Sequence, residues 1–409
     1  MKFIYNITIR GYQLMLLIAS LFHPKAKLWV KGRKNWKANL SQNLNGKTNI
    51  YWFHCASLGE FEQAKPLIES LKKTNSSIFI FVTFFSPSGY ENVKNYAFAD
   101  YISYLPIDSN ANAKWFVNNI NITKAFFIKY EFWYHYFSKL KEKKIPFYIV
   151  SATFRENQVF FKPFGKWYRT ILEMPTKIFV QDKASELLLN KFNIKSIVSG
   201  DTRYDRVSEN AKTTDKYPLI KEFINEEFTV LAGSSWQEEE RILGEFFVKN
   251  KGDFKLIIAP HDISKSHVQF IHNQFDKSIS TCNYSELESL KNKAEIEVLI
   301  IDNIGMLSSL YQYSDIAIIG GGFSGEIHNI LEPATFGNPV FYGKNHAKFP
   351  EAKLMVREGS GYEFETVEEL EIKFFPLFEN KEKLAGAKQK SLDFIQSRIG
   401  ATNKILSEI

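Results

Sequence analysis

Short apolar runs rich in β-branched and aromatic residues alternate along the chain with longer stretches that suit helices. This alternation constrains the fold most, because strands separated by helices pair in parallel and need helices on both faces of their sheet. Seven runs lie in the first half, at residues 49–55, 78–84, 101–105, 125–128, 147–150, 178–180 and 197–199. Five more follow a polar stretch, at residues 228–232, 254–259, 297–301, 315–319 and 339–342. The pattern predicts an α/β protein with two Rossmann-like domains, each built on a parallel sheet.

The length of 409 residues agrees with two domains, because a single core rarely grows beyond about 250–300 residues. Two lobes also supply a cleft. We predict a basic and apolar segment (1–36), a first Rossmann-like domain (37–206), a linker (207–220), a second Rossmann-like domain (221–380) and a C-terminal helical segment (381–409). The last segment is a candidate for crossing back to the first domain.

Positive charge is concentrated at the N-terminus. Nine of the 52 basic residues precede the first acidic residue, Glu60, which leaves 43 basic against 45 acidic residues in the rest of the chain. The basic residues flank an apolar run at 12–22 (YQLMLLIASLF), which is too short to span a bilayer but suits an amphipathic surface helix. We therefore expect monotopic attachment to an anionic membrane surface and no nucleic-acid partner. A secretory signal peptide and an ordinary docking helix remain alternatives.

The two cysteines, Cys55 and Cys282, lie far apart and belong to no CxxC or Cys/His cluster. This spacing suggests neither a disulfide framework nor a zinc site. A reducing compartment fits best.

Ligands of open parallel sheets bind beyond the carboxyl ends of the strands, so the residues after each predicted strand are the first candidates for chemistry. Residues 56–60 (ASLGE) follow the first strand, and Glu60 begins a predicted helix. Glu60 is therefore a candidate general base. An acidic residue is also favoured in a first helical turn by the helix dipole alone, and this structural interpretation stays open.

Two further strand ends carry charged residues. Glu131 follows a strand within the aromatic sequence KYEFW (129–133), where a buried carboxylate needs a cation or a hydroxyl. Arg203 lies in GDTRYD (200–205), near the predicted domain boundary, and is a candidate ligand for an anion. A surface ion pair explains either residue equally well.

A glycine-rich segment, IGGGFSGEIHNILEPA (319–334), follows a late strand, and its backbone amides are suited to phosphate. It matches G-x-G-x-x-G, but that fingerprint opens the first βαβ unit of a domain, so we interpret the match as accidental. Asn329 and Glu332 are three residues apart on the next predicted helix and share a face that suits ribose hydroxyls. This arrangement fits a nucleotide sugar. Helix capping and glycine turns are the structural alternative.

Six sequence blocks in a fixed order cover nearly the whole chain: WFHCASLGEFEQAKPLI (52–68), YLPID (104–108), EFW (131–133), residues 200–205, PHD (260–262) and GGGFSGEIHNILEPATFGNPVFYG (320–343). Together they resemble the 3-deoxy-D-manno-octulosonic acid (Kdo) transferases of lipopolysaccharide synthesis. The resemblance implies the GT-B fold, in which the parallel sheets of two Rossmann-like domains face each other across a cleft.

The resemblance also implies residue roles. The family's catalytic glutamate matches Glu60, and a second glutamate that supports the transition state matches Glu131. The family's cytidine nucleotide contacts map onto Pro260, His261, Ile304, Gly305, Met306, Asn329, Ile330, Leu331 and Glu332. We expect the amides of Gly321 and Gly322, with Arg203 or His261, to stabilise the charge on the departing phosphate.

The chain departs from the family pattern at three of these positions. Arg203 stands where the family has Lys, which keeps the charge and adds a planar fork of donors. His261 stands where the family commonly has Arg, and Met306 where it has Glu. These two changes weaken the expected nucleotide contacts, because His is a pH-dependent cation and Met offers no acceptor oxygen.

The implied reaction is inverting transfer of Kdo from CMP-Kdo to a primary hydroxyl of a lipid A precursor (lipid IVA), with Glu60 as the base and neither metal nor cofactor. The implied location is the cytoplasmic face of the bacterial inner membrane. Two other classes stay open. A nucleotide-sugar epimerase of the same double-Rossmann plan would need no lipid acceptor, and a non-catalytic lipid-binding protein would not depend on Glu60.

Overall fold

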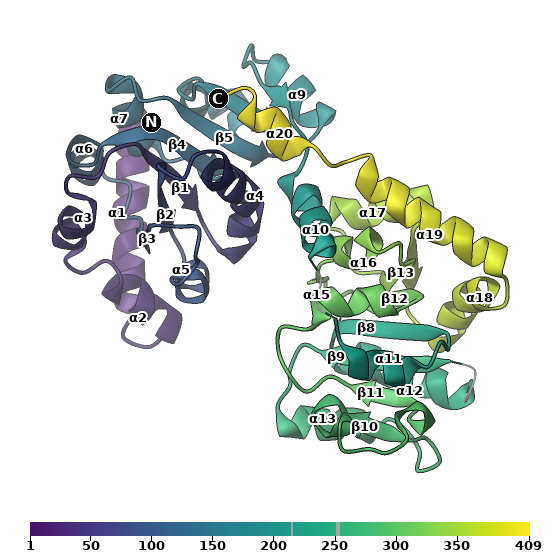
Figure 1. The fold of residues 1–409 in the computed structure, drawn as a ribbon. Helices are drawn as coiled ribbons and strands as arrows, with labels where there is room; N and C mark the ends of the chain where they lie inside the picture. The colour runs from purple at the N-terminus through teal and green to yellow at the C-terminus, as the bar shows by residue number, and fades with distance from the viewer. Residues whose placement is uncertain (214–215, 251–253) are drawn as a thin grey trace. The chain divides into compact units, whose positions relative to one another are not determined.

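The computed structural model describes residues 1–213, 216–250 and 254–409, which form two units (Figure 1). Unit 1 comprises Met1–Arg206 with Ile399–Ile409, and unit 2 comprises Val207–Arg398. Each unit contains a seven-stranded sheet. All neighbouring strands in both sheets run parallel. The predicted α/β fold with two parallel sheets is confirmed.

The sheet of unit 1 has the strand order β3-β2-β1-β4-β5-β6-β7, so the order reverses between β1 and β4. Its strands are β1 (Ile50–Cys55), β2 (Phe79–Phe84), β3 (Tyr101–Tyr104), β4 (Ile122–Ile128), β5 (Phe147–Ala152), β6 (Lys177–Val180) and β7 (Ile197–Val198). Its helices are α1 (Lys2–Ala19), α2 (Pro24–Lys31), α3 (Trp36–Leu44), α4 (Leu58–Thr74), α5 (Pro87–Val93), α6 (Asn110–Asn119), α7 (Tyr134–Glu142), α8 (Lys166–Leu172), α9 (Lys183–Asn190) and α20 (Ala401–Leu406), with short 3₁₀ turns η1 (Val159–Phe161) and η2 (Pro163–Gly165).

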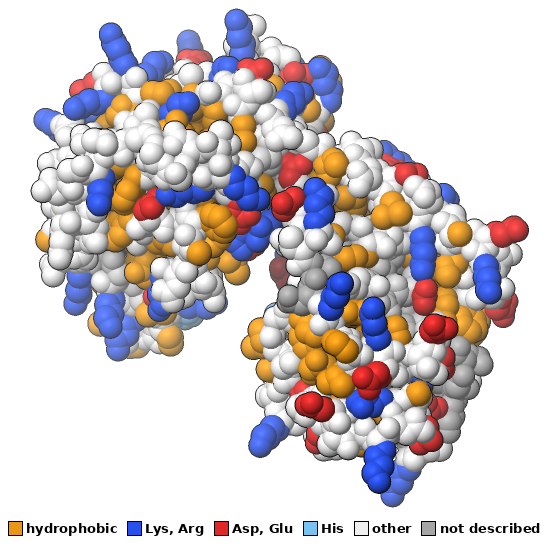
Figure 2. All heavy atoms as spheres, viewed as in Figure 1, with side chains coloured by type: hydrophobic (Ala, Val, Ile, Leu, Met, Phe, Trp, Pro, Cys, Tyr) orange, Lys and Arg blue, Asp and Glu red, His pale blue; other side chains and the backbone are white. Residues whose placement is uncertain are grey.

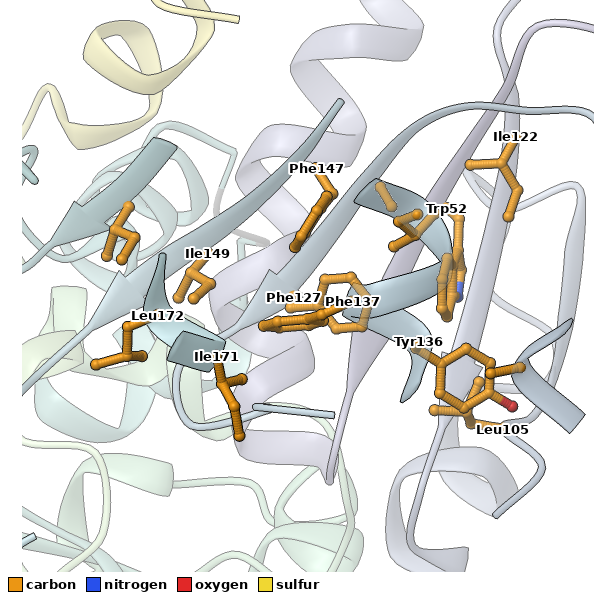
Figure 3. Packing of buried hydrophobic residues seen from close by; sticks show 14 of the residues in the cluster. Trp52, Leu105, Ile122, Phe127, Tyr136, Phe137, Phe147, Ile149, Ile171 and Leu172 are labelled. Atoms are coloured by element: carbon orange, nitrogen blue, oxygen red, sulfur yellow. The ribbon is translucent and has the colours of Figure 1, made fainter. Parts of the chain in front are cut away.

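Alternate residues of each central strand enter two different cores, because helices cover both faces of the sheet. On one face, Trp52 of β1 meets Phe127 of β4 with ring centroids 5.0 Å apart, within the cluster drawn in Figure 3. On the other face, the adjacent residues Phe53 and Phe126 stack at 4.5 Å. Strands buried on both sides read as continuous apolar runs, which explains why their positions are visible in the sequence.

The sheet of unit 2 has the order β10-β11-β9-β8-β12-β13-β14, with its reversal between β8 and β12. Its strands are β8 (Thr229–Ser235), β9 (Lys255–Pro260), β10 (Thr281–Asn283), β11 (Val298–Ile300), β12 (Ile316–Ile319), β13 (Val340–Gly343) and β14 (Gly361–Phe364). Its helices are α11 (Pro218–Ile224), α12 (Gln237–Lys249), α13 (Lys265–His272), α14 (Tyr284–Leu287), α15 (Leu307–Leu310), α16 (Leu331–Thr335), α17 (Pro350–Glu358), α18 (Val367–Phe378) and α19 (Lys381–Gln396), with 3₁₀ turns η3 (Lys293–Glu295) and η4 (Tyr311–Tyr313). The edge strands β10 and β14 were not predicted.

The predicted linker at 207–220 is largely helical. Helix α10 (Thr202–Lys212) crosses the boundary between the units, and α11 begins at Pro218, while residues 214–215 lie outside the described residues.

The predicted C-terminal segment at 381–409 divides between the two units. Helix α19 belongs to unit 2, where it buries Phe394 and Ile395 and where Lys388 pairs with Asp315 at 2.7 Å. Only Ile399–Ile409 belongs to unit 1. Among the helices of the described residues, none has both the length and the apolar character that a membrane crossing requires.

Candidate functional site

The turn after β1 holds Glu60 in a defined orientation. Ser57 is the N-cap of α4 and Glu60 its third residue, and the two side chains form a capping box. Glu60 Oε2 accepts hydrogen bonds from the Ser57 backbone N–H at 3.0 Å and from the Ser57 hydroxyl. Within the described residues, Oε1 accepts no hydrogen bond and Glu60 joins no ion pair. Glu60 therefore has a structural role at the start of α4, and one of its carboxylate oxygens remains available.

Glu131 follows β4, the strand that pairs with β1. Its Oε2 accepts hydrogen bonds from the Trp133 indole N–H at 2.8 Å and from His54 Nε2 at 3.0 Å. The Glu131 side chain is 11 % exposed and that of His54 is fully buried. The partners of this carboxylate are thus the ring nitrogens of Trp133 and His54.

Hydrogen bonds across β1 and β2 hold the ring of His54 in place. The Trp52 indole donates to Thr83 Oγ1 at 2.8 Å, and Thr83 Oγ1 lies 2.9 Å from His54 Nδ1. His54 Nδ1 also lies 3.1 Å from the backbone oxygen of Thr83, which can only accept, and the Thr83 hydroxyl donates to the Phe53 oxygen at 3.4 Å. Both ring nitrogens of His54 therefore face acceptors, Thr83 at Nδ1 and Glu131 at Nε2. Neither His54 nor Thr83 was predicted as a site residue from the sequence.

The two carboxylates share the carboxyl edge of the β1/β4 pair. Burial raises the pKa of the Cys55 thiol, the last residue of β1, and the negative charges of Glu60 and Glu131 raise it further. Both carboxylates are therefore close enough to Cys55 for their charges to affect its thiol. This edge is also where the strand order reverses, the usual ligand position in open parallel sheets.

Arg203 lies just after β7 in the first turn of α10. Its Nη2 and Nε atoms each lie 2.8 Å from Asp201 Oδ2, and Asp201 Oδ1 accepts a bond of 3.3 Å from Gln63 of α4. The structure therefore contains an ion pair at Arg203, which was one of the two interpretations of this residue. Its positive charge is offset by Asp201, which lowers what it offers to an anion.

In unit 2, three aromatic rings gather at the carboxyl ends of the central strands. Trp236 follows β8, and its ring stacks on His261, which follows β9, at 4.2 Å. His328 lies 4.8 Å from the His261 ring, and its Nε2 accepts a hydrogen bond of 3.2 Å from the Trp236 indole. Burial, and to a smaller extent His261, lower the pKa of His328. Trp236 remains 41 % exposed, so this cluster presents a flat aromatic surface. Of these three residues, only His261 was predicted from the sequence.

The glycine-rich turn does not offer the amide that the sequence suggested. The Gly321 N–H donates to Glu239 Oε1 at 2.8 Å, and Glu239 Oε2 accepts from the Trp236 N–H at 3.2 Å. Glu239 is only 1 % exposed, and burial raises its pKa. A phosphate at the Gly321 amide would have to displace a buried carboxylate, so the expected phosphate contact at Gly321 is not available in this structure.

The other glycines of this turn allow close backbone approaches. A Cβ atom on Gly322 would lie 2.4 Å from the Gly343 nitrogen, and one on Gly320 would lie 2.1 Å from the Ser234 oxygen. Packing against β13 and β8 therefore accounts for these two residues.

The remaining predicted nucleotide contacts differ in what they expose. Asn329 lies before α16 rather than on it, and its amide donates to Glu332 Oε1 at 3.0 Å. Ile330 and Leu331 are buried as whole residues, at 2 % and 1 % exposure, and the Leu331 N–H donates to Asn329 Oδ1 at 3.1 Å, so neither residue is accessible to a ligand in this structure.

The loop after β11 and the end of β9 contain the other predicted positions. Ile304 is 86 % exposed, Gly305 has a positive φ of 99°, and Met306 is buried as the N-cap of α15. Pro260 ends β9. In residues 1–213, 216–250 and 254–409, no group of three or more His, Cys, Asp or Glu side chains is arranged to hold a metal ion.

A family model described as 3-deoxy-D-manno-octulosonic-acid transferase (kdotransferase) matches residues 31–206, which include Glu60 and Glu131. The 3-deoxy-D-manno-octulosonic acid transferase of Aquifex aeolicus is 28% identical over 349 residues, covering 84% of this chain and 90% of that protein. The corresponding protein of Haemophilus influenzae is 26% identical, covering 76% of this chain and 74% of that protein. A bifunctional glycosyltransferase/methyltransferase of Fusobacterium nucleatum is 27% identical over 97% of this chain, which spans 63% of that longer protein.

Solved structures with low sequence identity share the fold. A UDP-GlcNAc 2-epimerase from Neisseria meningitidis matches with a TM-score of 0.60 and 18% identity, over 88% of this chain and 98% of its own. MurG of Acinetobacter baumannii matches with a TM-score of 0.54 and 13% identity, over 88% of this chain and 99% of its own. At these identities the likeness concerns the GT-B type arrangement of two Rossmann-like domains and not the reaction.

Proposed function

We propose that this chain, which is similar to 3-deoxy-D-manno-octulosonic acid (Kdo) transferases over most of its length, is a glycosyltransferase that transfers Kdo from CMP-Kdo to a hydroxyl of a lipid A precursor, lipid IVA. The observation that carries the proposal is the Glu60 carboxylate. One of its oxygens is held by Ser57, and the other is available at the reversal point of the unit 1 sheet.

In the proposed reaction, Glu60 Oε1 takes the proton of the acceptor hydroxyl. The acceptor oxygen bonds to the anomeric carbon of Kdo while the bond from that carbon to the CMP phosphate oxygen breaks, and CMP leaves with the electron pair. Attack opposite the leaving group inverts the anomeric centre. General-base help of this kind is worth about 10²- to 10⁴-fold in rate.

Glu131 would act on the developing positive charge of the sugar ring. Its carboxylate is nearly buried, and the ring N–H groups of His54 and Trp133 hold its orientation. A fixed negative charge in a water-poor site stabilises an oxocarbenium-like transition state more strongly than one in bulk water. His54 and Trp133 would be positioning residues for this carboxylate.

For the nucleotide, we propose that the exposed Trp236 and His261 rings stack with the cytosine, since such surfaces accept a base face. Glu332 and the Asn329 amide would bind the ribose hydroxyls. Backbone atoms of Ile304–Met306 would complete the contact. Arg203 or His261 would meet the charge on the departing phosphate, and the proposal includes neither metal nor cofactor.

Helix α1 supports a proposed position at a lipid surface. The Tyr5 hydroxyl donates to Asp108 at 2.5 Å, and Asn6 Oδ1 lies 2.7 Å from His135 Nε2, so these polar residues of α1 face the rest of unit 1. The apolar side chains of Phe3, Leu14 and Ile18 are exposed by 75 %, 59 % and 56 %.

An apolar helix face turned outward, with lysines near its C-terminal end, matches the composition of an interfacial helix. Figure 2 shows hydrophobic side chains exposed among Lys and Arg side chains on the visible face of unit 1. We propose monotopic attachment at the cytoplasmic face of the bacterial inner membrane.

The direct test is incubation of the purified protein with CMP-Kdo and lipid IVA, followed by mass spectrometry of the lipid. The expected result is a lipid heavier by one Kdo for each transfer. Recovery of unchanged lipid IVA would refute the proposed transfer. Conversion of a nucleotide sugar without any lipid acceptor would favour the epimerase alternative.

A further inference from the structure

A cavity of about 200 Å³ lies in unit 1 beneath α1, among side chains of α1, α2, α3 and α6. Gln13 and Leu17 of α1, Trp29 of α2 and Arg33 line it. At about 30 Å³ for each water molecule of liquid, this volume holds a small polar group together with its hydration. The proposed catalytic roles use none of these residues.

Arg33 brings an unneutralised positive charge to this cavity. Its guanidinium donates to the backbone oxygens of Leu105 at 2.8 Å, Phe85 at 2.8 Å and Trp29 at 3.1 Å. A guanidinium has five N–H donors, so two of them have no acceptor in the part of the chain that the structure describes. Among the described residues, no carboxylate forms an ion pair with Arg33.

Burial lowers the pKa of Arg33 to about 9, against the opposing effect of nearby tyrosine hydroxyls, which agrees with a charge that lacks a carboxylate partner. The guanidinium lies 3.8 Å from the Trp29 ring centroid and 5.0 Å from that of Tyr104. These rings pack against the guanidinium and restrict its movement.

Trp29 supplies a second unused donor. Its side chain is buried at 5 % exposure, and its indole N–H finds no acceptor among the described residues. An orphaned buried N–H costs about 1–3 kcal/mol when it remains unsatisfied, so it indicates a missing acceptor. Trp29 and Arg33 line the same cavity, and because the indole nitrogen itself is covered, an acceptor in the cavity reaches it only when the neighbouring side chains shift.

The surroundings of the cavity indicate what carries this acceptor. Leu17 lines the cavity and is 43 % exposed, and the apolar surface continues to Leu21 at 75 %. Phe85 and Leu105, whose oxygens hold Arg33, directly follow β2 and β3, so the cavity lies at the carboxyl edge that also carries Glu131.

From these observations we propose that the cavity is a binding site for the phosphate group of a lipid, with the Arg33 guanidinium and the Trp29 indole N–H as its donors. A phosphate offers several charged acceptor oxygens at once, which suits a guanidinium fork beside a single N–H. The lipid's apolar part would continue along Leu17 and Leu21. Only the lipid source rests on the proposed function, since a phosphate site is defined by the cavity itself.

The test uses the full chain with ¹⁵N-labelled tryptophan. The Trp29 indole signal is identified by its loss in Trp29→Phe, and it is followed during titration with hexyl phosphate, inorganic phosphate and hexanoate. We expect saturable shifts with hexyl phosphate, binding at least about tenfold weaker for inorganic phosphate, and no shift with hexanoate. An unmoved signal with both phosphates overturns the site, equal affinity for both phosphates overturns the lipid source, and an equal response to hexanoate overturns phosphate selectivity.

Matched variants test the donors by calorimetric titration with hexyl phosphate. Arg33→Gln is expected to weaken binding at least about tenfold, which converts to about 1.4 kcal/mol. Trp29→Phe keeps a ring in the core and removes only the N–H, so it tests the site even if Arg33→Gln fails to fold. Lys34→Gln removes a neighbouring exposed charge and should leave the affinity unchanged. Unaltered binding in Trp29→Phe would refute the assignment of its N–H. No step requires CMP-Kdo, so a failed transfer assay and a failed phosphate titration are separate outcomes.

Discussion

Replacing Glu60 by glutamine separates the two roles of this side chain, because glutamine keeps one and removes the other. Glu60 Oε2 accepts both hydrogen bonds from Ser57, and Oε1 accepts none from the described residues. A glutamine therefore places its carbonyl oxygen at the Oε2 position and turns its amide toward the open side, and Gln is itself suited to this position of a capping box. It cannot take a proton from an acceptor hydroxyl.

We expect Glu60→Gln to lower turnover by about 10²- to 10⁴-fold, equivalent to about 2.7–5.4 kcal/mol of transition-state stabilisation, with little change in melting temperature. Glu60→Ala loses both capping bonds as well, at a cost of about 1–2 kcal/mol. For a unit of this size, each kcal/mol lowers the melting temperature by about 2–4 °C. Initial rates of Kdo transfer and calorimetric melting of the same preparations measure both effects.

Glu62→Gln is the matched control, because it removes a carboxylate from the same helix that instead pairs with Lys65 at 2.5 Å. Its turnover should equal that of the unmodified protein. Unchanged turnover in Glu60→Gln would refute the base assignment. A loss of stability in Glu60→Gln as large as in Glu60→Ala would refute the hydrogen-bond reasoning.

Three further outcomes follow from other parts of the chain. Leu14→Asp, on the exposed face of α1, should release the protein from sedimenting anionic vesicles, whereas Thr8→Asp, at the edge of this face, should release less; equal binding of both variants would contradict the surface orientation. Burial lowers the pKa of His135 to about 4, so the unfolded chain, with an ordinary pKa near 6.5, binds the proton more readily. The stability contributed by neutral His135 should therefore be complete above about pH 6.5 and fall as the pH drops toward 4, and urea unfolding of His135→Gln should show a weaker acid loss. Glu239→Gln should cost about 1–3 kcal/mol of unit 2 stability in a melting experiment, because its amide would face a backbone N–H donor; an unchanged melting temperature would contradict this.

The strands of both sheets were predictable because parallel strands buried on two faces are continuous apolar runs. The short edge strands β10 and β14 were not, since each contains only three or four residues with polar or glycine positions among them. Glu60 and Glu131 were recognisable because both follow predicted strands.

The partners of these residues were not predictable. His54 has the sequence position of a core residue, and its contact with Glu131 spans 77 residues. The pairing of Trp236 with His328 spans 92 residues. Such contacts depend on strand order and register, which no local pattern encodes.

The same local rule places a glutamate at the start of the helix after the central strand in both units, yet only one of them is suited to proton transfer. Glu60 and Glu239 are each the third residue of their helix, α4 and α12, and each bonds back to the N-cap backbone N–H. They differ in their second oxygen. In Glu239 this oxygen is bound to Gly321 in a position only 1 % exposed, whereas in Glu60 it is available. A general base must reach its proton directly, so the capping position by itself does not identify one, and the availability of the second oxygen distinguishes the catalytic candidate from the structural residue.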